Sequence, residues 1–95
     1  MSLNRVDART DANQTPIIKA LRAIGCQVLI IKWPLDLLVS GGRLGDENLL
    51  MECKMPGEKL NASQESFWLR WPGRKVMVQT PEEAVEAVLG KEMLR

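Results

Sequence analysis

The chain has 95 residues, 45% of them hydrophobic and 26% charged, with a formal net charge of +1 and no histidine. Its length and composition predict a single globular domain over residues 1–95 with a modest hydrophobic core. The small net charge points to neither a nucleic-acid binder nor an acidic partner, and the missing histidine excludes Ser-His and Cys-His nucleophile–base pairs, so any catalysis must rest on carboxylates, lysine or a bound metal ion.

The first half of the chain predicts one helix and three strands. Apolar residues recur at helical spacing before Gly25, which stops the helix, and they are Ile17, Ile18, Leu21 and Ile24. This helix is expected to begin near residues 11–15. The apolar segment "QVLIIK" (27–32) predicts a buried strand. A second strand, "LDLLVS" (35–40), is turned back by the loop "GGRLGDE", and "NLLMECK" (48–54) predicts the third.

The second half predicts a helix, a strand and a last helix. Asn61 caps a helix over 62–71, which "WPG" ends, and "KVMVQ" (75–79) predicts the fourth strand. Thr80 caps the last helix, and Glu83 is expected to close a capping box. The inward face of this helix is expected to carry Ala84, Val85, Val88 and Leu89. The predicted order of elements is α-β-β-β-α-β-α.

The cysteines and the apolar runs bear on the cellular setting. Cys26 and Cys53 are isolated in the sequence, which predicts two small buried apolar side chains and not a zinc site. The longest apolar run, "VLII", is far shorter than the ~20 residues that span a bilayer, and the polar N-terminus lacks the apolar stretch of a signal peptide. We therefore expect a cytoplasmic protein without a membrane partner.

The third predicted strand contains two charged residues within an apolar segment. Side chains alternate across a strand, so Glu52 and Lys54 project from one face. The opposite face, toward the core, carries Leu49, Met51 and Cys53. Asp36 opens the preceding strand. If the two strands pair through the loop between them, Asp36 lies opposite the end that carries Glu52 and Lys54.

Two carboxylates at this position indicate a cation site. They repel each other unless a cation lies between them, and Mg²⁺ prefers one or two carboxylates, a backbone carbonyl and several waters. A lysine beside such an ion can hold the attacking water and offset charge that grows on a phosphate. These features outline a metal-dependent phosphodiesterase. The alternative is an ordinary acid–base pair on the solvated face of a hairpin.

Several segments together resemble the VRR-NUC family of the PD-(D/E)XK nuclease superfamily, in particular its small standalone phage and bacterial members. Asp36, followed sixteen residues later by Glu52-Cys53-Lys54, resembles the D…E-x-K signature. The supporting segments, in chain order, are "RVDARTDANQ", "LRAIGCQV", "PLDLLVSGG", "LLMECKMPGEKLNASQESF" and "WPGRKVMVQTPEEAVEAV". One departure is Leu35, which separates Pro34 from the aspartate that the family usually places directly after proline. The resemblance implies an α/β fold with a PD-(D/E)XK restriction-endonuclease-like core, a mixed central sheet flanked by helices.

The resemblance also implies roles for individual residues. Asp36 and Glu52, helped by the backbone carbonyl of Cys53, would ligate Mg²⁺ or Mn²⁺. Lys54 would position the nucleophilic water.

Two glutamines would lie near this site. Gln64 matches a glutamine on the helix after the catalytic strand, and Gln14 matches an acidic or amide residue of the first helix. Each also has a structural interpretation, because Gln64 stands three residues after Asn61 and Gln14 three residues after Asp11, the spacing of a capping box.

The implied activity is that of a metal-dependent, structure-selective DNA endonuclease that acts on branched DNA, with four-way (Holliday) junctions as the first candidate. Flap cleavage or nicking is the alternative within this class, and a catalytically inactive nucleic-acid-binding or interaction module is the alternative outside it. A phage-encoded protein of this kind would work in the host cytoplasm. We also expect a homodimer, with Trp33, the loop "GGRLG" and the C-terminal "KEMLR" as candidate interface.

The tryptophans have two interpretations. Trp68 and Trp71 are three residues apart and would share one side of a helix. Core packing explains them, and so does stacking on an unpaired base. Trp33 would line the mouth of the site or a partner surface.

Overall fold

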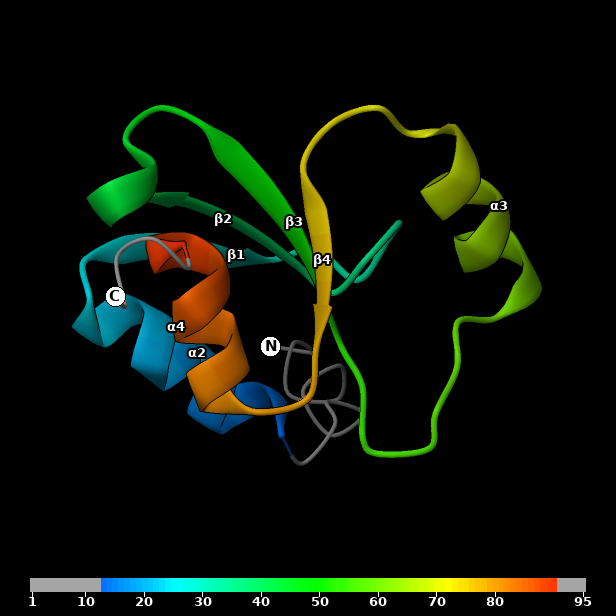
Figure 1. Ribbon diagram of the computed structural model, residues 1–95, viewed down its shortest axis with the longest axis horizontal. Helices are drawn as coiled ribbons and strands as arrows, with labels where there is room; N and C mark the ends of the chain where they lie inside the picture. The colour runs from blue at the N-terminus through cyan, green and yellow to red at the C-terminus, as the bar shows by residue number, and fades with distance from the viewer. Residues whose placement is uncertain (1–12, 91–95) are drawn as a thin grey trace, which may run out of the picture.

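The computed structural model describes residues 13–90, to which all structural statements below refer. Three helices and a four-stranded sheet follow one another along the chain (Figure 1). In order, the elements are α2 (Gln14–Ala23), β1 (Cys26–Ile30), β2 (Leu37–Gly41), the short 3₁₀ helix η1 (Gly42–Leu44), β3 (Asn48–Cys53), α3 (Ala62–Arg70), β4 (Lys75–Val78) and α4 (Pro81–Leu89). The predicted order α-β-β-β-α-β-α of an α/β fold is confirmed.

The sheet is mixed, with the strand order β1-β2-β3-β4. β1, β2 and β3 form an antiparallel meander, whereas β4 pairs with β3 in parallel. A parallel pair needs a crossover connection, and α3 lies within that connection. The register places Leu38 opposite Leu50 and Leu37 opposite Met51, which brings the start of β2 beside the end of β3.

The helices lie on both faces of the sheet. Figure 1 shows α2 and α4 together on one side and α3 on the other. The core lies between the sheet and the α2–α4 layer, and its most deeply buried members include Ile17, Leu21, Val39, Met51 and Ala84. Cys26 and Cys53 are both buried free thiols, as predicted.

The prediction of a buried first strand over 27–32 is only partly correct. β1 lies at an edge of the described sheet, and of its five residues only Cys26 and Val28 are buried. Val28 points into the core, whereas Leu29, on the other face, is 59% exposed. Residues 28–31 are all apolar, so their composition did not show that only one face of the strand is covered.

Details of the helix ends also differ from the prediction. Thr80 accepts the Glu83 N–H, but the Glu83 carboxylate accepts the N–H of Gln79 at 2.6 Å, so the capping box is only half formed. In α4 the buried positions are Ala84 and Val88, while Val85 is only partly covered, as is Leu89. The proposed interface segment "KEMLR" (91–95) lies outside the described residues.

Candidate active site

The candidate site forms where β2 begins and β3 ends. The antiparallel register places Asp36 beside Glu52 and Cys53. The Asp36 N–H donates to Glu52 Oε1 at 3.1 Å, and the Cys53 N–H donates to Asp36 Oδ2 at 2.9 Å. Each strand end therefore binds the carboxylate of the other, and the two acids that the sequence predicted as a pair lie together.

The carboxylate of Glu52 is buried and held by two further side chains. Glu52 is 2% exposed, although it is an acid. Its Oε2 accepts a hydrogen bond from Gln64 Nε2 at 3.0 Å and lies 3.3 Å from Lys54 Nζ. The Lys54 side chain is 16% exposed, so its ammonium connects the buried acid to the surface. The simple surface ion pair, which was the alternative interpretation, does not describe this geometry, because the acid is removed from solvent.

Burial is the main cause that raises the pKa of Glu52, and the neighbouring charge of Asp36 raises it further. The hydrogen bonds from Gln64 and Lys54 and the positive charge of Lys54 lower the pKa, but they do not cancel the two larger effects. A positive ion at this position would relieve both the repulsion and the desolvation. The protein groups around Glu52 therefore do not fully offset the cost of its buried negative charge.

Gln64 makes the capping contacts and also reaches the buried acid. The Asn61 side chain accepts the Gln64 N–H at 2.8 Å, and the Asn61 N–H donates to Gln64 Oε1 at 3.2 Å, which completes a capping box. The other end of the same amide donates to Glu52. Capping orients the side chain, so that its NH₂ group points at the buried acid.

Gln14 is buried at the start of α2, but the capping interpretation of this residue is wrong. The N-cap is Asn13, so Gln14 occupies the first helical position, while Asp11 lies outside the described residues. Within residues 13–90, the Gln14 Oε1 atom is buried without a hydrogen-bond partner.

Asn13 itself was not predicted as functional. Its Nδ2 donates to the carbonyls of Lys54 and Gln79, both at 3.0 Å, and so fastens the start of α2 to the ends of β3 and β4.

The donor set fits a hard divalent cation. Over residues 13–90 no cluster of three His, Cys, Asp or Glu side chains is present, so a metal would rely on two carboxylates and backbone oxygen. The Cys53 N–H points at Asp36, and the carbonyl of a strand residue points to the same side as its N–H, so the Cys53 carbonyl is a suitable third donor. Glu52 accepts from three donors, which leaves it about one more acceptor position. Oxygen ligands of this kind suit Mg²⁺ or Mn²⁺.

Two of the three tryptophans lie at the end of α3. α3 ends at Arg70, so Trp71 lies past the helix, where its ring stacks on Phe67 with centroids 5.5 Å apart. Trp68 is half-buried, and the Lys75 ammonium lies 5.4 Å from its ring centroid. Trp71 is the C-cap residue, and its N–H still donates to the Phe67 carbonyl at 2.9 Å, so the predicted helix end at residue 71 is correct to within one residue.

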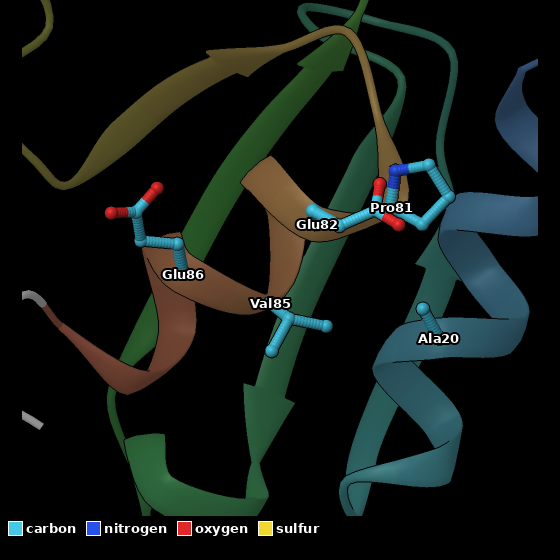
Figure 2. Close-up of a pocket in the computed structure, with 5 residues that line it drawn as sticks. All are labelled: Ala20, Pro81, Glu82, Val85 and Glu86. Carbon is cyan, nitrogen blue, oxygen red and sulfur yellow. The ribbon is translucent and has the colours of Figure 1, made fainter. Parts of the chain in front are cut away.

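A pocket lies between α2 and α4, and neither Asp36 nor Glu52 lines it. It is lined by Ala20, Pro81, Glu82, Val85 and Glu86 (Figure 2). Figure 2 shows the Val85 side chain in the space between the two helices. The lining offers two acids, Glu82 and Glu86, and no basic or nucleophilic group.

Comparisons with protein-family models, with curated proteins and with solved structures gave no significant match. Among the described residues, no helix has both the length and the apolar character that crossing a membrane requires.

Proposed function

We propose that this protein is a metal-dependent endonuclease of the PD-(D/E)XK type, similar to the standalone VRR-NUC nucleases, and that it hydrolyses phosphodiester bonds in branched DNA. The observation that carries the proposal is the pair of carboxylates, Asp36 and Glu52, held together by each other's backbone and accompanied by Lys54 at 3.3 Å. The mixed sheet with helices on both faces agrees with the core that the resemblance implies.

Asp36, Glu52 and the carbonyl of Cys53 would hold Mg²⁺ or Mn²⁺. The bound ion would polarise a phosphate oxygen and lower the pKa of a coordinated water. The amide oxygen of Gln14, buried without a partner in the described part of the chain, is a further oxygen at the end of the sheet where Asn13 joins α2 to Lys54.

Lys54 would act on water and phosphate, and its contact with Glu52 supports this assignment. An ammonium has three donors, and one of them is directed at Glu52 Oε2. The remaining donors can orient a water and offset negative charge on the phosphate as it is attacked. Gln64 is a positioning residue, since it donates to the Glu52 oxygen that also contacts Lys54.

Cleavage assays on labelled four-way junction, flap and linear duplex, run in parallel with Mg²⁺, Mn²⁺ and EDTA, test the proposal. We expect metal-dependent cleavage that favours the branched substrates, with Glu52→Gln inactive. Glu65→Gln, an exposed acid of α3, is the matched control and keeps activity. Binding of branched DNA without cleavage under either metal would instead favour the inactive interaction module.

A further inference from the structure

A pocket of 520 Å³ opens on the same face of the sheet as the two carboxylates. Leu38 and Leu50, which pair across β2 and β3, form its floor. Leu50 is two residues from Glu52, and Leu38 is two residues from Asp36. Because residues two apart in a strand share a face, all four side chains project from the same face of the sheet. Two residues of a strand span about 7 Å. The pocket therefore begins directly beside the candidate active site.

The walls of the pocket are aromatic and come from separate parts of the chain. Trp33, in the link between β1 and β2, is 58% exposed, and Trp71, beyond α3, is 46% exposed. Phe67 stacks behind Trp71 and holds its ring. Gly73 leaves the space that the indole needs, because a Cβ atom there would lie 2.5 Å from Trp71 Nε1. The structure thus holds two large aromatic rings partly exposed at the walls of the pocket.

Polar groups complete the lining. Asn48, on the same face of β3 as Leu50 and Glu52, offers both an amide donor and an amide acceptor, which suits the edge of a nucleobase. Arg74 also lines the pocket, and its guanidinium donates to Glu47 Oε1 at 2.6 Å. Flat aromatic walls, an amide and a cation are the groups that bind single-stranded nucleic acid.

We propose that this pocket binds one unpaired nucleobase of the strand whose phosphodiester lies at Asp36 and Glu52, with Trp33 and Trp71 as stacking platforms. The inference rests on the proposed nuclease function, and it narrows the substrate class to DNA with an unpaired nucleotide beside the cut. A base inside a duplex is stacked on both faces and must first be extruded, which costs least when the base is already unpaired.

The test measures binding in EDTA, by fluorescence anisotropy, so that its outcome does not depend on catalysis. The probes are flap DNAs that carry a single abasic site at successive positions around the branch, together with the intact flap and a linear duplex. At one position, removal of the base should weaken binding by roughly 5-fold to 150-fold, the range expected for loss of one base–aromatic stack. The affinity for the linear duplex should not change when one of its bases is removed.

Variants assign this effect to the pocket. Trp33→Ala and Trp71→Ala should bind the intact and the abasic flap equally, while Trp33→Phe, which keeps a ring, retains part of the preference. Leu69→Ala, at an α3 residue that is 81% exposed and lies outside the pocket lining, is the control and should behave like wild type.

Three results would overturn the inference. The first is a wild-type protein that cleaves branched DNA but is indifferent to an abasic site at every position; this leaves the nuclease function standing. The second is an equal loss of affinity for all DNAs in both alanine variants together with a change from dimer to monomer, which would make the pocket an interface between copies. The third is absence of both DNA binding and metal-dependent cleavage, which rejects the nuclease function as well.

Discussion

Glu52 has a buried carboxylate whose two oxygens receive a backbone N–H, an amide and an ammonium. Burial and Asp36 raise its pKa above the ordinary value of 4.5. Below pH 4.5 the side chain is protonated in both the folded and the unfolded protein and costs nothing. As the pH rises through the raised pKa, the folded protein must carry a buried charge, and stability is lost.

The resulting prediction concerns the protein in EDTA. The melting temperature of wild type minus that of Glu52→Gln should become more negative as the pH rises from 4.5 to 8, since only wild type has the carboxylate that must ionise. Differential scanning fluorimetry at several pH values measures this difference. A difference that stays constant with pH would show that the ionisation of Glu52 carries no cost in the fold.

Lys54 gives the second prediction at this scale. Lys54→Ala should lower kcat by about 10²–10³, the usual cost of losing one group that stabilises developing charge. Lys54→Arg should recover little of the loss, because a planar guanidinium does not reproduce the point charge of an ammonium. Lys59→Ala, at an exposed lysine of the following loop, is the control. Single-turnover cleavage decides the matter, and an active Lys54→Ala protein would reject the assigned role.

At the scale of elements, the first turn of α3 contains a residue, Gln64, that both caps the helix and contacts Glu52. Asn61→Ala removes the cap but leaves the amide of Gln64 bonded to Glu52, so it should cost about 1 kcal/mol of stability, or roughly 4–8 °C in Tm, with activity nearly unchanged. Gln64→Leu removes the donor to Glu52 and should lower activity or metal affinity by about 10–100-fold. Circular dichroism melts and cleavage rates measure the two effects separately, and equal activity losses in both variants would mean that Gln64 acts only through the helix.

The extent of sequence prediction also differs between elements. The strands, helices and their order followed from periodicity, glycine and proline, and the pairing of Asp36 with Glu52 followed from a hairpin register. The exposure of Leu29 did not follow, because it depends on which face of the sheet a helix covers. Nor did the role of Asn13, whose bonds join carbonyls 41 and 66 residues away along the chain. Local patterns determine the elements, while such long-range contacts arise only from the packing of the whole fold.

For the molecule as a whole, metal binding should raise the free energy of unfolding and therefore the Tm. A ligand that binds only the folded state stabilises it by about 2.7 kcal/mol at a concentration 100 times its Kd, which is roughly 10 °C or more for a domain of this size. Mg²⁺ or Mn²⁺ should therefore raise the Tm of wild type. Asp36→Asn should show a smaller rise, and a higher Tm than wild type in EDTA, because it removes the repulsion and keeps an oxygen for the Cys53 N–H. Calorimetry that detects no binding at millimolar metal, with or without DNA, would contradict the metal site.

The remaining prediction is a homodimer. Each chain carries one candidate site, whereas resolution of a four-way junction needs two cuts on opposing strands, and a twofold dimer places two sites with that symmetry.

The described sheet offers an edge for such a dimer. β1 pairs with β2 on one side only, its sequence CQVLI has no charge or proline that would block pairing, and Leu29 and Ile30 are exposed on it. Sedimentation at micromolar concentration should give twice the chain mass of 10.7 kDa, and Leu29→Lys should give the monomer, with Leu69→Lys on α3 as the control. A wild-type monomer that still resolves junctions would contradict the dimer, because one site would then make both cuts in succession.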